Sequence, residues 1–209
     1  MTGRNATSQH IPARTQHISR VGMIAATYAA LTLIVTLFLS GLAWGPIQFR
    51  LSEALCVLAL FTPDAIPGLT LGCALANIVN IALSGTGTLG LLDVVFGSLA
   101  TLLGATFTWH FHDKPKLALV GPVLFNALIV PAYLPLMLTA LGFTTIPFTS
   151  ISLSESYILV YLFGAMTVGI GEAVVMYALG MPLYHALAKT SLSDRLRSTP
   201  TGAERGPKA

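Results

Sequence analysis

Six apolar segments, each long enough to cross a lipid bilayer, dominate this sequence of 209 residues. They cover roughly residues 21–43, 46–62, 65–83, 88–110, 117–142 and 157–184. A spanning helix needs about 17–25 mostly apolar residues. Only 9% of the residues are Asp, Glu, Lys or Arg, against about 25% in soluble domains. Because a soluble fold could not cover its surface with so few charges, the sequence predicts an all-α integral membrane protein, a bundle of six transmembrane helices.

The two ends of the chain are polar and are expected to lie outside this bundle. Residues 1–20 and 188–209 are predicted to be disordered cytoplasmic tails, and residues 21–187 a single membrane domain. No cleavable signal peptide is expected, because the first apolar run is too long for one.

The basic residues predict the orientation of the bundle. With six spans, one side holds both tails, the turn at residues 62–64 and the loop at residues 110–116. That side carries Arg4, Arg14, Arg20, Lys114, Lys116, Lys189, Arg195, Arg197, Arg205 and Lys208. The connections on the other side carry no Lys or Arg. Since Lys and Arg concentrate on the cytoplasmic side of membrane proteins, both termini are expected to be cytoplasmic.

Charged residues inside membrane spans are costly and usually mark a pathway or a binding site. The segment WGPIQFRLSEAL, from Trp44 to Leu55, places Arg50 and Glu53 in the second predicted span. In the predicted topology several polar residues share the extracellular depth. They are Gln48, Arg50, Glu53, Asn77, Asn80 and Asp93. Their common depth predicts a pocket open to the outside, whereas Glu172 and Asn126 lie nearer the middle of the membrane.

Each of these residues also has a structural interpretation. Arg50 and Glu53 are three residues apart on one helix face and could form an ion pair. Asn77 and Asn80 could form hydrogen bonds between helices. Asp93 could cap the fourth helix. These alternatives remain open from the sequence, and it is the shared depth that favours a site.

Two spacings of small residues on the first helix predict close helix packing. They are Ala25-x-x-x-Ala29 and the overlapping Ala26-x-x-x-Ala30. The sequence has no Walker loop and no catalytic or metal-binding motif. We therefore expect a solute binder or transporter that is not an enzyme and holds no cofactor or metal.

Three stretches resemble the QueT family. They are WGPIQFRLSEAL, FTPDAIPGLTLGCALANI and LLDVVFGSLATLLGA, and the similarity extends over about residues 25–182. Members of this family are substrate-binding S components of energy-coupling factor (ECF) transporters, linked to the uptake of queuosine precursors such as the 7-deazaguanine preQ1. The resemblance implies a six-helix S component in a prokaryotic cell membrane. It also implies as partners a transmembrane coupling subunit and two cytoplasmic ATPases.

The resemblance also suggests roles for residues. In S components the small-residue motif of the first helix faces the coupling subunit, which here implies Ala25 and Ala29. Glu53 or Asp93 could accept the ring N1–H and exocyclic amine of a deazaguanine together, and the amides Gln48, Asn77 and Asn80 suit its remaining edges. Trp44 could stack on the ring. Arg50 would hold Glu53 ionised and oriented.

Three other functions remain compatible with the sequence. One is an S component for a different small solute, such as a vitamin. Another is a self-sufficient proton-coupled carrier that uses Glu53, Asp93 or Glu172. The last is an intramembrane enzyme, which the lack of a nucleophile–base pair disfavours.

Overall fold

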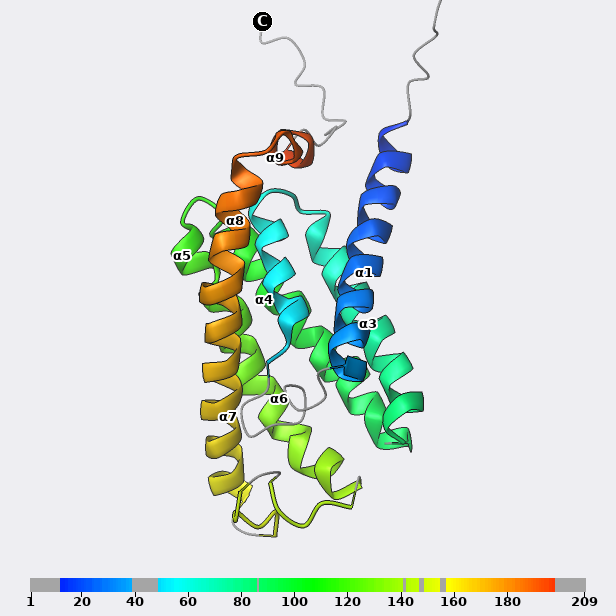
Figure 1. Ribbon diagram of the computed structural model, residues 1–209, viewed down its shortest axis with the longest axis vertical. Coiled ribbons are helices and arrows are strands. Elements are labelled where there is room, and N and C mark those ends of the chain that lie inside the picture. Colours follow the sequence, from blue (N-terminus) through cyan, green and yellow to red (C-terminus); the bar gives the residue numbers. More distant parts are fainter. Residues whose placement is uncertain are drawn as a thin grey trace, which may run out of the picture.

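The computed structural model describes residues 12–38, 49–85, 87–140, 142–146, 149–154 and 157–197, and every regular element in these ranges is helical. In chain order the elements are α1 (Ala13–Phe38), η1 (Leu51–Leu60), α3 (Ala65–Ser84), η2 (Gly87–Gly90), η3 (Asp93–Gly97), α4 (Ser98–His110), α5 (Pro115–Ala118), α6 (Val120–Ala140), α7 (Tyr157–Val174), η4 (Val175–Gly180), α8 (Met181–Ala188) and α9 (Ser191–Arg197). They form an elongated bundle, with the start of α1 and α9 at the same end (Figure 1).

Five of the six predicted spans correspond to helices that are long and apolar enough to cross a membrane. Among the described residues these are Ala13–Phe38, Ala65–Leu83, Gly87–His110, Pro115–Leu136 and Tyr157–Ala188. The protein is thus an all-α protein with several membrane-capable helices. Their outward sides carry large exposed apolar residues, such as Leu71, Leu128 and Leu162, which suits a lipid-facing surface.

The second predicted span, residues 46–62, differs from expectation. Its described part contains η1, a 3₁₀-helix of 10 residues. At about 2 Å per residue this helix is roughly 20 Å long, which is less than the roughly 30 Å hydrocarbon core. Most of its side chains are buried, because it lies in the middle of the bundle between α1 and the α7–α8 helix (Figure 1). Its apolar residues therefore build the core and do not face lipid.

Close packing of α1 on α3 depends on two glycines of α3. A Cβ atom on Gly72 would lie 2.7 Å from the backbone oxygen of Ala25, and one on Gly68 would lie 2.8 Å from Cβ of Ile24. The two helices can approach this closely only because these positions lack side chains. The main core then continues from Tyr28 of α1 to η1, α3 and η4.

Both terminal regions contain helix that the sequence did not predict. α1 begins eight residues before the expected start at residue 21, and α9 lies within the expected C-terminal tail. The buried Asp64, in the turn before α3, explains the first extension. Its carboxylate lies 2.7 Å from Nδ1 of His17 and 3.8 Å from Nη1 of Arg20. Arg20 also donates to the backbone oxygen of Leu196 in α9, at 3.5 Å.

Candidate functional site

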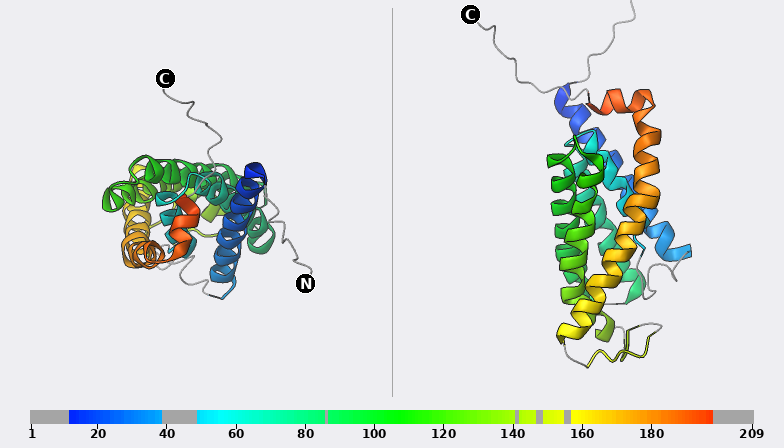
Figure 2. Two further views of the ribbon diagram at one scale, coloured as in Figure 1. Left: turned by 90° about the horizontal axis from the view of Figure 1, so that it is seen from above. Right: turned by 90° about the vertical axis from the view of Figure 1, so that its left-hand side faces the viewer.

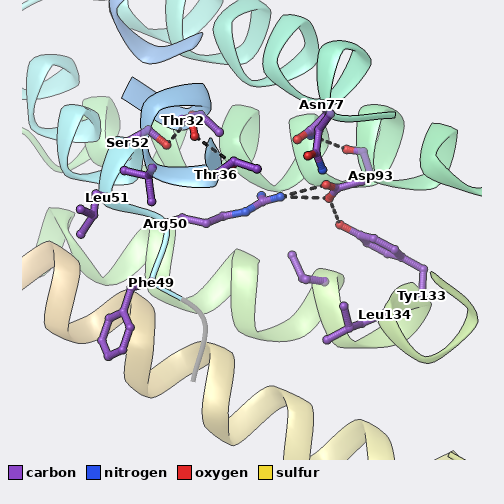
Figure 3. Close-up of a pocket in the computed structure, with 13 residues that line it drawn as sticks. Thr32, Thr36, Phe49, Arg50, Leu51, Ser52, Asn77, Asp93, Tyr133 and Leu134 are labelled. Atoms are coloured by element: carbon purple, nitrogen blue, oxygen red, sulfur yellow. Dashed lines mark hydrogen bonds and ion pairs between the residues drawn. The ribbon is translucent and has the colours of Figure 1, made fainter. Parts of the chain in front are cut away.

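A polar pocket lies between the helices of the bundle (Figure 3). It involves the second half of α1, which is the half away from α9 (Figure 1). Its residues come from the second halves of α1, α3 and α6, from the segment just before η1 and from the first residues of η1 and η3. They are Thr32, Val35, Thr36, Phe49, Arg50, Leu51, Ser52, Asn77, Asn80, Asp93, Val130, Tyr133 and Leu134. The ends of separate helices thus place their polar side chains at one depth.

Arg50 and Asp93 form an ion pair at this pocket. Nη2 of Arg50 donates to Oδ1 of Asp93 at 3.1 Å and to Oδ2 at 3.0 Å. The two side chains are 25% and 12% exposed, so the pair borders the cavity and is accessible from it. The other terminal nitrogen of Arg50, Nη1, is buried and has no hydrogen-bond partner among the described residues. The guanidinium therefore has unused donor capacity, on a nitrogen that is covered in this structure.

Two further side chains fix the position of Asp93. The Tyr133 hydroxyl donates to Oδ1 at 2.7 Å, and Nδ2 of Asn77 donates to the Asp93 backbone oxygen at 2.8 Å. Asp93 begins the π-helical segment η3, an irregularity that is frequent at functional sites. A Cβ atom on Gly97 would lie only 2.7 Å from Oδ1 of Asp93. Glycine at position 97 therefore leaves the space that the carboxylate occupies.

The structure brings together four of the residues singled out in the sequence. Arg50, Asn77, Asn80 and Asp93 all line the pocket. Trp44 and Gln48 lie outside the described residues.

Glu53 occupies a different environment from the one predicted. It is fully buried and does not line the pocket. Its Oε1 accepts hydrogen bonds from the hydroxyls of Tyr28 and Thr101, the latter at 3.1 Å. The Cys56 thiol donates to Oε2 at 3.2 Å. The predicted pairing of Arg50 with Glu53 is wrong, because the start of η1 directs Arg50 toward Asp93 and leaves Glu53 facing the interior.

The sequence interpretation missed two tyrosines. Tyr133 lines the pocket and contacts Asp93, and Tyr28 contacts Glu53. A tyrosine in an apolar run is normally interpreted as an aromatic residue of the core or of the membrane interface. The only hint was a polar hydroxyl on a helix expected to be apolar. Asn126 and Glu172 are buried but do not line the pocket.

The small residues of α1 face two different directions. Ala25 is buried against α3 and Ala29 is half-buried, whereas Ala26 and Ala30 are exposed. The surface of Ala25 is already covered within the chain, and Ala29 is partly covered, so the contact of these two residues with a partner stays a prediction. The overlapping pair one residue further along is the one that points outward.

Comparison with known proteins identifies the family of this chain. The family model described as QueT transporter matches residues 18–189. The "Queuosine precursor transporter QueT" of Lactococcus lactis subsp. cremoris (strain MG1363) is 38% identical over 90 residues, which are 43% of this chain and 52% of the relative. The alignment thus spans about half the length of that relative. No solved structure matched the chain at a significant level. Because the family model covers most of the sequence, the chain belongs to the QueT transporter family.

Proposed function

We propose that the chain is the substrate-capture subunit of an ECF-type importer and that it binds a queuosine precursor, a 7-deazaguanine such as preQ1. The observation that carries this proposal is the polar pocket around the Arg50–Asp93 pair in a member of the QueT family. The name of the L. lactis relative supports the solute class.

The polar groups of the pocket match the edge of a deazaguanine ring. The Asp93 carboxylate can accept the ring N1–H and the exocyclic amine together, which gives a charge-assisted, two-point contact. Nη1 of Arg50 is buried and has no partner among the described residues, so it can donate to the adjacent ring carbonyl once the side chain turns toward the cavity. Asn80 also lines the cavity and can donate or accept at another edge. Asp93, and not Glu53, is therefore the carboxylate assigned to the ring.

The size of the cavity implies that Arg50 moves when the solute binds. The volume is about 80 Å³, whereas small-molecule sites usually measure roughly 300–1,000 Å³. The Arg50 side chain is the more exposed partner of the ion pair and belongs to the segment before η1. In this mechanism the ring displaces Nη2 from Asp93, and the freed guanidinium then donates to the ring carbonyl.

Delivery of the solute requires other subunits. In the proposed orientation the ends of the chain are cytoplasmic, since they and the loop at residues 110–116 together carry all Lys and Arg residues except Arg50. The pocket, in the opposite half, then opens to the outside. The chain lacks a Walker loop, which fits ATP hydrolysis by two ATPases and transmission through a coupling subunit. The exposed Ala26 and Ala30 of α1 replace Ala25 as the proposed contact with that subunit.

A binding titration tests the solute assignment. The purified chain should bind preQ1 at micromolar or lower concentration, guanine through the same ring edge, and thiamine not measurably. Thiamine binding with no preQ1 binding would assign the chain to another solute.

Reconstitution tests the mode of transport. Uptake should require co-reconstituted coupling and ATPase subunits as well as ATP. Uptake by the chain alone in ATP-free vesicles would instead establish a secondary carrier, in which a buried carboxyl such as Glu172 could serve as the proton site.

A further inference from the structure

A groove lies between α5 and α8, at the end of the bundle that carries α9. Two types of side chain line it: Lys114, Lys116 and His185 are polar or basic, and Leu117, Met181 and Tyr184 form an apolar wall. Both lysines and the histidine are exposed. This combination of a basic rim with an apolar wall is the arrangement that an amphiphilic anion requires.

The charge of the two lysines is not neutralised by the residues around them. In the part of the chain that the structure describes, neither amine has a carboxylate within 4 Å. The neighbouring Asp113 is highly exposed, lies 3.5 Å from Nε2 of His112 and lines an adjacent hollow, not this groove. The groove therefore has a net positive rim.

The walls of the groove are anchored to the bundle. The Tyr177 hydroxyl donates to the Lys116 backbone oxygen at 2.9 Å and so holds α5 against η4. The Tyr184 ring stacks on Phe61 with 5.4 Å between ring centroids. Such contacts keep the two walls in a fixed relation and leave the lysine side chains to follow a ligand.

An exposed apolar surface continues from the groove along the bundle. Leu117, Val120 and Leu124 are exposed along α5 and α6, and Val174 and Tyr177 are exposed on the neighbouring helix. α5 and α8 lie on the side of the bundle away from α1, where the exposed small residues are (Figures 1 and 2). The groove is therefore continuous with a lipid-facing surface and separate from the proposed coupling surface.

We propose that this groove binds one anionic phospholipid, with its phosphate between Lys114 and Lys116 and its acyl chains along Leu117 and the α6–α7 surface. His185 can donate a further hydrogen bond to the headgroup. A zwitterionic lipid would place its own cation against the lysines. The groove thus selects for negative headgroups, and this selection does not depend on which solute the chain carries.

Fluorescence quenching by brominated lipids can test the proposal, because Trp109 lines the adjacent hollow together with Tyr184. Trp44→Phe leaves Trp109 as the single tryptophan of the chain. The full chain in phosphatidylcholine nanodiscs should be quenched more strongly by a small fraction of brominated phosphatidylglycerol than by the same fraction of brominated phosphatidylcholine. Lys114→Gln and Lys116→Gln should each lower the apparent affinity for phosphatidylglycerol by about fivefold.

Lys189→Gln provides the matched control, since Lys189 follows α8 but does not line the groove. It should leave the lipid preference unchanged. In the parent protein, raising the salt concentration should reduce the preference, because exposed charges are screened; this measurement needs no altered lysine. Equal quenching by the two lipids, or a lysine double variant that keeps the preference, would overturn the proposal. A double variant that keeps the preference but no longer co-purifies with a coupling subunit would assign the groove to a protein.

Discussion

The Arg50 guanidinium shares one nitrogen between the two oxygens of Asp93, at 3.1 and 3.0 Å. This contact joins the segment before η1 to the start of the fourth span, 43 residues later in the sequence. Glu53, only one turn from Arg50, instead takes its hydrogen bonds from Tyr28, Thr101 and Cys56. The two charged residues at the start of η1 therefore have separate roles: Arg50, just before the helix, borders the pocket with Asp93, and Glu53, in its first turn, belongs to the core.

Asp93→Asn should weaken preQ1 binding by more than about tenfold, because a hydrogen bond to a charged group contributes roughly 1.5–3 kcal/mol. It should also lower the thermal stability, since Arg50 would lose its counter-ion. The double variant Arg50→Gln/Asp93→Asn removes both charges and should recover stability without recovering binding. Isothermal titration calorimetry and thermal unfolding measure the two effects. Full affinity in Asp93→Asn would remove Asp93 from the site.

Tyr133→Phe should weaken solute binding by roughly tenfold, since it deletes the hydroxyl that orients Asp93 at 2.7 Å. Tyr161→Phe is the matched control, because the Tyr161 hydroxyl donates to the Leu128 backbone oxygen on an exposed face. The same titration on both variants separates the pocket from general effects of removing a tyrosine hydroxyl. Equal affinities for the two variants would show that Tyr133 has no positioning role.

The sequence predicted the all-helical class of fold and the grouping of Arg50, Asn77, Asn80 and Asp93, because both depend on patterns along single helices. Hydropathy is summed over a whole span, and the positions of Arg50, Asn77 and Asp93 follow from counting residues from its ends. The partner of Arg50 could not be predicted in this way. Whether a side chain at the start of a helix pairs with a residue one turn away or 43 positions away depends on the packing of separate helices.

The sequence could not predict, for a related reason, that residues 51–60 form a short buried helix and not a membrane-spanning one. An apolar run of this kind fits both a spanning helix and a buried core helix. Packing around η1 decides between them. For example, Val57 lies so close to η4 that a Cβ atom on Gly180 would be 3.2 Å from it.

Gly97→Ala should reduce solute binding strongly, because its added Cβ atom would meet Oδ1 of Asp93 at 2.7 Å and Nδ2 of Asn77 at 3.2 Å. Helix propensity favours alanine over glycine by about 1 kcal/mol, so the helix itself should not be weakened. Gly22→Ala is the control, since a Cβ atom there has no neighbour within 4 Å. Binding titrations and circular dichroism of both variants test this, and unchanged binding in Gly97→Ala would contradict the geometry of the site.

Glu53→Gln should act mainly on stability. The NH₂ group of the glutamine would face one of the side chains that now donate a hydrogen bond to the carboxylate. Two donors would then face each other, and a buried unsatisfied group costs about 1–3 kcal/mol. We expect a lower unfolding temperature and, at temperatures where the variant stays folded, an affinity for preQ1 within a few-fold of the parent. Thr101→Val, which removes one donor to the same carboxylate, should show a similar but smaller loss of stability. Normal stability with abolished binding would return Glu53 to the solute site.

Ala30→Trp should block ATP-driven transport but leave solute binding by the isolated chain intact. Ala30 is exposed on α1, so the chain itself can accommodate a large side chain there. A partner helix can approach this surface closely only while its residues are small, and an indole ring would keep that helix at a distance. Ala25→Trp should instead impair folding, because the backbone of Ala25 lies against Gly72 with no space for an indole ring. Co-purification with the coupling subunit, solute binding and thermal stability together distinguish the two outcomes. Transport by Ala30→Trp at the parent rate would place the coupling surface elsewhere on the chain.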